Sequence, residues 1–173
     1  MKRKLSNYMQ KYDPKFNSRW NKTEYLPKKP VKSFLDLEVY QKSLEAAVFV
    51  AKSIAMPKKK TKISELEKLI INTAVNCALS IPHQIAEAHS TRFGSQTSCL
   101  VFLEKVMLNC NKMVVYLEQI RDICKTNAEH EQFEELIKKY FYIRRKVLNL
   151  QRVWKKYMFQ KQGESQPPAA ITE

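Results

Sequence analysis

The chain has 173 residues, a formal net charge of +14 at pH 7 and only two glycines. The length favours one domain with its own core, and the scarcity of glycine argues against a sheet-rich fold, whose hairpin turns need positive φ angles. No run of about 20 apolar residues is present to span a membrane, and the charge favours a polyanionic partner: nucleic acid first, then an acidic protein or an anionic membrane.

Lys, Glu, Leu, Ala and Gln dominate the composition, and all five are good helix formers, so we predict an all-α fold. The cysteines contain no C-x-x-C pair; they are Cys77, Cys99, Cys110 and Cys124. We expect buried thiols in a reducing cytosol rather than disulfides or a zinc site. The N-terminus is basic but lacks the apolar core of a signal peptide, which favours a cytoplasmic protein without a membrane partner.

Residues 1–32 are predicted to form a basic N-terminal arm, because they contain ten Lys and Arg against two acids, with three prolines. Four aromatic residues in this arm recur every four positions: Tyr8, Tyr12, Phe16 and Trp20. That spacing would align them along one stripe of a helix. They either pack onto the domain, or stack on bases or dock a partner.

Four amphipathic helices are predicted after the arm. The first begins at Ser33, which together with Asp36 resembles a capping box, and it ends at Pro57. The others are expected at about 64–88, 95–124 and 129–160. Pro82 falls inside the second helix, where the loss of one backbone hydrogen bond predicts a kink rather than a break.

These helices predict an antiparallel up-down four-helix bundle over residues 33–161, followed by a disordered tail at 162–173. The residues expected to face its core are Leu37, Tyr40, Leu44, Ala47, Val48, Ala51, Ile54, Leu66, Leu69, Ile70, Ala74, Cys77, Ile81, Ile85, Ala88, Leu100, Leu103, Val106, Met107, Cys110, Met113, Leu117, Ile120, Phe133, Ile137, Tyr140, Ile143, Val147, Leu150, Trp154 and Tyr157. Phe49, Phe102 and Phe141 lie off these faces, which favours contacts between subunits.

The stretch SIPHQIAEAHSTR, residues 80–92, places His83 and Glu87 four residues apart on one helix face. Such a pair could hold a metal ion, with the carboxylate as a general base. A metal-binding bundle usually repeats the pair on a partner helix, and no second pair is present. The alternative is a hydrogen bond at the surface or at an interface. We therefore expect no enzymatic activity and no cofactor.

Two motifs carry a family resemblance. FLDLEVYQKSLEAAVFV, residues 34–50, and the SIP stretch resemble the bacterial four-helix-bundle family of ribosomal-RNA intervening-sequence proteins, which reads F-x-D-L-x-V-W/Y-Q-x-A and S-I-P-x-N-I-A-E-G. The matching residues are Phe34, Asp36, Leu37, Val39, Tyr40, Gln41, Ser80, Ile81, Pro82, Ile85, Ala86 and Glu87. The chain departs from the family at Gln84 and Ala88, at Val75 and Asn76, where arginines are common, and in the arm, which has no counterpart.

The resemblance implies a small non-enzymatic bundle that assembles as a ring-like homopentamer. Related proteins include the accessory variability determinant of diversity-generating retroelements, which is basic, binds nucleic acid and partners a reverse transcriptase. The same resemblance implies that the SIP motif is architectural, with Ser80, Pro82 and Glu87 as its structural residues.

Basic residues concentrate in the fourth helix, which has seven Lys and Arg and no acid from Arg144 to Lys161. Lys138, Arg145 and Arg152 are seven residues apart and are predicted to form one outward stripe. The stripe is either a solvated face or, as its single sign favours, a phosphate contact. The candidate nucleic-acid-binding residues are Lys138, Arg144, Arg145, Lys146, Arg152, Lys155 and Lys156, Lys58, Lys59, Lys60 and Lys62 in the loop, and Lys2, Arg3, Lys4, Arg19 and Trp20 in the arm.

The sequence leaves three functions open. The first is an oligomeric nucleic-acid-binding accessory protein, acting beside a reverse transcriptase or as a ribosomal-RNA intervening-sequence protein. The second is an oligomeric scaffold for an acidic protein. The third is a metal-dependent hydrolase that uses His83 and Glu87.

Overall fold

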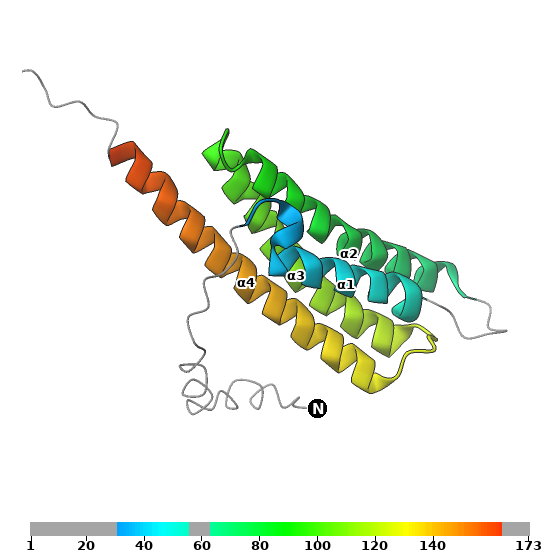
Figure 1. The fold of residues 1–173 in the computed structure, drawn as a ribbon. Helices are drawn as coiled ribbons and strands as arrows, with labels where there is room; N and C mark the ends of the chain where they lie inside the picture. The colour runs from blue at the N-terminus through cyan, green and yellow to red at the C-terminus, as the bar shows by residue number, and fades with distance from the viewer. Residues whose placement is uncertain (1–30, 56–62, 164–173) are drawn as a thin grey trace, which may run out of the picture. The chain divides into compact units, whose positions relative to one another are not determined.

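The computed structural model describes residues 31–55 and 63–163, and these form an all-α four-helix bundle (Figure 1). Residues 1–30 of the expected arm, the loop with its four lysines and most of the expected tail lie outside the described residues. The elements are a 3-10 turn at Phe34–Asp36, α1 at Glu38–Phe49, a π-helical extension at Val50–Ile54, α2 at Glu65–Thr91, α3 at Gln96–Ile123 and α4 at His130–Gly163. None of these described helices is both long and apolar enough to cross a membrane.

The capping box predicted at Ser33 is confirmed. The hydroxyl of Ser33 accepts a hydrogen bond from the backbone N–H of Leu35 at 3.2 Å, and the carboxylate of Asp36 accepts one from the N–H of Ser33 at 2.9 Å. The backbone N–H groups of Ser33 and Lys32 lower the pKa of Asp36. The box caps the 3-10 turn, and the α-helix itself begins only at Glu38.

Helix α2 begins with a second capping box, at the residue where the sequence placed its start. The hydroxyl of Ser64 accepts from the N–H of Glu67 at 3.2 Å, and the Glu67 carboxylate accepts from the N–H of Ser64 at 2.8 Å. The helix continues through Pro82, as predicted, and ends at Thr91, three residues later than expected. The ends of α3 agree with the sequence within one residue.

The core draws on all four helices. Its largest fully buried side chains include Ile85, Leu103, Met113, Tyr140 and Ile143. The cysteines are free thiols, three of them buried and one half-buried, as expected. Burial raises the pKa of Cys110 to about 12 and that of Cys77 to about 11, so both stay protonated at neutral pH.

Two of the predicted core positions at the start of α2 are wrong. Leu66 and Leu69 are 58% and 64% exposed, whereas Ile71 is buried. The buried line of α2 runs through Ile71, Ala74, Ala78, Ile81, Ile85 and Ala88. Apolar residues lie on two sides of the first turns of this helix, and only the side that faces its neighbours is buried.

Further corrections concern α1 and α4. Leu44 and Val48 are about two-fifths exposed and Tyr157 is 64% exposed, although all three were predicted to face the core. Helix α4 has 34 residues and α1 has 12, and Figure 1 shows the C-terminal part of α4 continuing past the start of α1. Tyr157 lies in the last two turns of α4.

Candidate nucleic-acid interface

The predicted outward stripe of α4 is confirmed as a solvent-exposed face. Lys138, Arg145 and Arg152 are all exposed, and so is Lys156. A step of seven residues brings an α-helix back to nearly the same angle, so the first three cations share one side of the helix. Lys156 follows Arg152 by one turn and joins the same side. These four residues are called the α4 basic stripe below.

From Arg145 onward the charges of the α4 basic stripe are not offset by their own helix, because no acid follows Glu135 in α4. Lys138 differs, since Glu134 and Glu135 precede it by four and three residues on the same helix. Within residues 31–55 and 63–163, none of the four stripe cations takes part in an ion pair. Arg145 instead lies 5.7 Å from the ring centroid of Tyr142. The stripe therefore presents positive charge to solvent.

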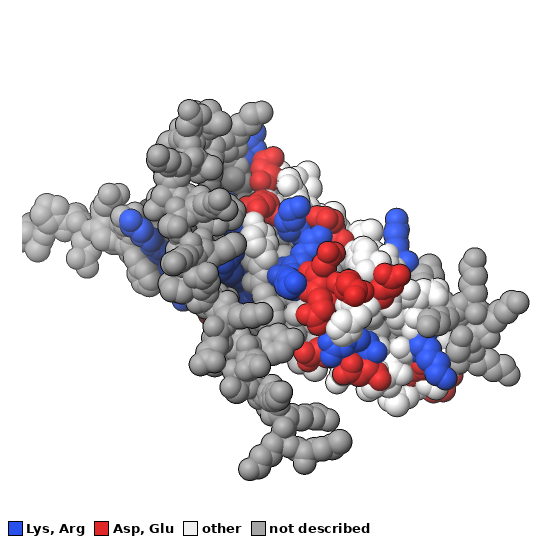
Figure 2. Space-filling model, turned by 90° about the horizontal axis from the view of Figure 1, so that it is seen from below, with Lys and Arg blue, Asp and Glu red and all other residues white. Residues whose placement is uncertain are grey.

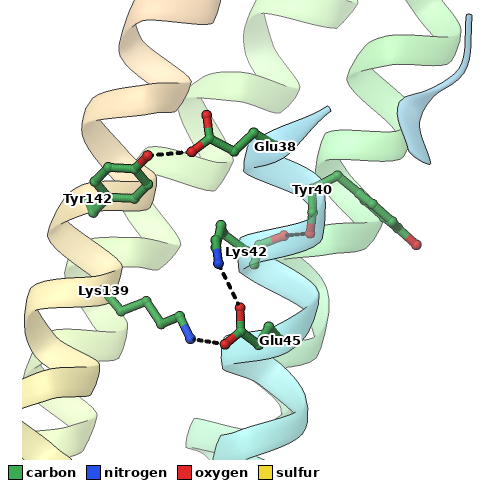
Figure 3. A network of polar contacts seen from close by, with 7 residues as sticks. Glu38, Tyr40, Lys42, Glu45, Lys139 and Tyr142 are labelled. Atoms are coloured by element: carbon green, nitrogen blue, oxygen red, sulfur yellow. Dashed lines mark hydrogen bonds and ion pairs between the residues drawn. The ribbon is translucent and has the colours of Figure 1, made fainter. Parts of the chain in front are cut away.

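Lys146, one of the predicted nucleic-acid-binding residues, forms an ion pair with an acid of α1. Its ammonium lies 2.9 Å from the carboxylate of Glu38 on α1. The same carboxylate accepts a hydrogen bond from the Tyr142 hydroxyl at 2.5 Å (Figure 3). Because Tyr142 and then Lys146 stabilise the ionised form, the pKa of Glu38 is lowered. Further along the same two helices, Lys139 pairs with Glu45 at 2.7 Å. These contacts tie α1 to α4.

Arg144 also lies off the stripe. It is half-buried, its Nε atom is buried with no hydrogen-bond partner among the described residues, and its charge acts on the buried Cys110 of α3. Lys155 is half-buried as well. Of the seven predicted cations of α4, four therefore form the exposed stripe.

Elsewhere the two signs of charge mix. Arg121 contacts Asp122 at 2.8 Å and Glu134 at 3.3 Å near the α3–α4 turn. Figure 2 shows acidic and basic side chains next to one another across the middle of the face that it views. Mixed charge is typical of an ordinary solvated surface, so the single sign of the α4 basic stripe distinguishes it.

The SIP motif joins α2 to α3. The hydroxyl of Ser80 donates to the carbonyl oxygen of Cys77 at 2.8 Å and accepts from the side-chain amide of Asn109 at 3.1 Å. The same amide donates to the side-chain oxygen of Gln84 at 3.1 Å. Pro82 is buried. These contacts support the architectural role expected of Ser80 and Pro82. The Glu87 side chain is exposed and makes no hydrogen bond within the described residues.

His83, the other half of the candidate metal pair, is also exposed. Across residues 31–55 and 63–163, no group of three His, Cys, Asp or Glu side chains is placed to hold a metal ion. The third functional hypothesis therefore has no ligand set in the part of the chain that the structure describes.

Sequence reasoning missed His89, the buried histidine of the same stretch. Its ring lies 6.4 Å, centroid to centroid, from Phe34 and from Trp154, and Arg92 contacts its Nδ1 atom at 2.6 Å. Burial and the charge of Arg92 lower the pKa of His89. The sequence did carry a signal for this burial. His89 follows the core residue Ile85 by four positions and Ala88 by one, so it lies on the core side of α2.

The loop and arm candidates, Lys58, Lys59, Lys60, Lys62, Lys2, Arg3, Lys4, Arg19 and Trp20, lie outside the described residues. Comparisons of the chain with protein-family models, with curated proteins and with solved structures found no match.

Proposed function

We propose that this chain is a non-catalytic, oligomeric accessory protein that binds nucleic acid through the α4 basic stripe. The observation that carries the proposal is the exposed run of Lys138, Arg145, Arg152 and Lys156, which has one sign of charge and no ion pair within the described residues. Binding of a nucleic acid to such a face is favourable because each phosphate contact releases condensed counterions.

Recognition in this proposal depends on the phosphate backbone. At about 1.5 Å of rise per residue, cations seven residues apart on α4 are roughly 10 Å apart along the helix axis. Lysine and arginine side chains are long enough to reach several phosphates from such a row. No groove-reading motif is present in the sequence, so binding would depend on charge and shape more than on base sequence.

The resemblance favours a ring-like homopentamer as the working assembly. Exposed apolar side chains offer independent support: Leu44 and Val48 on α1 and Leu79 on α2 are each about two-fifths exposed. Of the three phenylalanines expected at subunit contacts, Phe141 is 54% exposed, whereas Phe49 and Phe102 pack against the core. A ring would repeat the α4 basic stripe and raise its avidity for a long polyanion.

The same resemblance favours a reverse transcriptase of a diversity-generating retroelement as the protein partner. A neighbouring reverse-transcriptase gene with template and variable repeats would support that partnership. A reading frame inside a ribosomal RNA gene would favour an intervening-sequence protein instead. The remaining alternative is an oligomeric scaffold for an acidic protein.

The direct test is fluorescence anisotropy of the full chain with labelled single-stranded RNA, duplex DNA and polyglutamate, between about 50 and 200 mM salt. The proposal expects binding to both nucleic acids, with affinity falling steeply as salt rises. Binding to polyglutamate without binding to either nucleic acid would overturn it and support the acidic-protein scaffold.

A further inference from the structure

Lys139 lies beside the α4 basic stripe but is held by an acid of α1. It follows the stripe residue Lys138, and both side chains line one cavity of about 430 Å³ where α1 meets α4, together with Glu135. The Lys139 ammonium lies 2.7 Å from one carboxylate oxygen of Glu45, and the other oxygen lies 3.3 Å from the ammonium of Lys42 (Figure 3). Both oxygens of Glu45 therefore have a donor.

Lys146 repeats this arrangement seven residues, about two turns, further along α4. It follows the stripe residue Arg145. The Lys146 ammonium and the Arg145 guanidinium lie 5.2 and 5.7 Å from the ring centroid of Tyr142. The Lys146 ammonium lies 2.9 Å from one carboxylate oxygen of Glu38, and the other oxygen accepts from the Tyr142 hydroxyl. Each of the two lysines thus neighbours one stripe cation and is paired with one glutamate of α1.

The two glutamates are charged at neutral pH. The hydrogen bond from Tyr142 is the main cause that lowers the pKa of Glu38. The hydrogen bond from Lys139 has the same effect on the pKa of Glu45. A phosphate that approached either paired lysine would also come close to a carboxylate, and the two like charges repel. Both ion pairs are partly exposed, and such pairs are weak, so neutralising the glutamates should leave the fold intact.

We propose that Glu38 and Glu45 withhold Lys146 and Lys139 from phosphate, so that α1 limits how many phosphates this face of α4 neutralises. The inference rests on the proposed function and adds a restraint to it. The cations of the face extend beyond the α4 basic stripe, and the acids of α1 confine a nucleic acid to the exposed ones. Each phosphate contact adds to the affinity and to its salt dependence, so α1 lowers both.

The test is a salt titration of the full chain with a labelled DNA duplex, between about 50 and 200 mM salt. The α1 variant combines Glu38→Gln with Glu45→Gln. Glutamine carries no charge but keeps a side-chain oxygen that can accept from the Tyr142 hydroxyl. The variant should bind the duplex more tightly than the wild type. Its slope of log K against log salt should be steeper, by up to about 0.9 for each of the two lysines released.

Glu65→Gln combined with Glu87→Gln is the matched control. It removes the same charge from two exposed residues of α2, and it likewise releases a lysine, because Glu65 pairs with Lys68 at 2.7 Å. Its slope should equal that of the wild type. Equal slopes for the two glutamate pairs would overturn the inference while leaving the proposed function intact.

Adding Lys139→Gln and Lys146→Gln to the α1 variant restores the wild-type net charge. It should return the slope to the wild-type value, because the released lysines are the source of the gain. A gain that persists without these lysines would overturn the inference. A slope shallower than that of the wild type would also overturn it, by showing that the paired lysines already bind phosphate. Absence of salt-sensitive binding by every one of these proteins would overturn the proposed function and this inference together.

Discussion

Asn109 of α3 donates its side-chain amide to the hydroxyl oxygen of Ser80 on α2, at 3.1 Å. A second hydrogen of the same amide reaches Gln84, one turn further along α2, at the same distance. The two α2 residues flank the buried Pro82. A proline inside a helix leaves the carbonyl four residues earlier without its backbone donor, so this segment of α2 benefits from contacts supplied by a neighbouring helix.

Asn109→Ala should lower the free energy of unfolding by about 1–2 kcal/mol relative to Asn111→Ala, because it removes two hydrogen bonds between α2 and α3. Asn111 is exposed on the same helix, so the control carries the same gain in helix propensity. Urea denaturation followed by circular dichroism, at one protein concentration, measures both variants. Equal stability of the two would contradict the role assigned to the SIP contacts.

The buried His89 should make stability depend on pH. Its pKa in the folded chain is lowered from 6.5 by burial and by Arg92, which directly follows α2, while Asp36 of the 3-10 turn opposes the shift. Phe34 and Trp154, its other neighbours, carry no charge. The unfolded chain therefore takes up the proton first, so this contribution to stability is complete above about pH 6.5 and is lost as the pH falls towards the lower folded pKa.

The measurement is the free energy of unfolding at about pH 7.5 and at about pH 5.5, on either side of the ordinary histidine pKa. His89→Gln removes the titrating group and should lose less stability between these two values than the wild type. His83→Gln, which alters an exposed histidine, should show the full wild-type loss. If all three proteins lose the same free energy of unfolding between the two pH values, His89 is ruled out as the titrating group.

The contact between α1 and α4 in Figure 3 predicts a modest effect on stability. Tyr142→Phe removes the hydrogen bond to Glu38 and should cost about 0.5–1.5 kcal/mol. The ion pair with Lys146 is exposed and contributes less than a buried pair would. Tyr116→Phe, a half-buried tyrosine of α3, is the control and should change little. Equal losses in the free energy of unfolding for Tyr142→Phe and Tyr116→Phe would contradict a stabilising role of the Tyr142–Glu38 hydrogen bond.

The exposed apolar residues of α1 and α2 predict self-association. Light scattering at micromolar concentration should detect a species several times heavier than the 20.4 kDa chain. Leu44→Asp together with Leu79→Asp should reduce the mass, whereas Leu108→Asp together with Val115→Asp on α3 should not. All four residues are 40–53% exposed, so the folded subunit should tolerate both pairs. A wild-type protein found only at 20.4 kDa would contradict the oligomer.

Much of the fold was predictable because its signals are local. Ser33 and Ser64 cap helices with partners two or three residues away, and such spacing is visible in a sequence. The exposed leucines at the start of α2 were not predictable, because periodicity reports that a helix has an apolar side but does not report which neighbour covers it. Leu66 and Ile71 are both strongly apolar, and only the packed structure separates them.

In the candidate site, too, the features with a local signal were predictable and the long-range contacts were not. The exposure of Arg145 and Arg152 follows from helical spacing alone. The pairing of Lys146 with Glu38 joins residues 108 positions apart, and no local pattern indicates it. The same holds for Arg144, whose half-buried side chain acts on Cys110 of α3. A run of like charges therefore predicted where cations concentrate but not which of them are free to bind.

The central claim is that the α4 basic stripe binds phosphate, and a salt titration of one triple variant tests it most directly. Arg145→Gln, Arg152→Gln and Lys156→Gln should together weaken binding to single strands and duplex of every sequence. They should also make the slope of log K against log salt shallower, by up to about 0.9 for each duplex phosphate that the variant no longer neutralises. The control triple, Lys52→Gln, Lys112→Gln and Lys125→Gln, removes the same charge from exposed positions outside α4 and should keep nearly the wild-type slope. Equal slopes for the two triples would contradict the claim, because net charge alone would then account for binding.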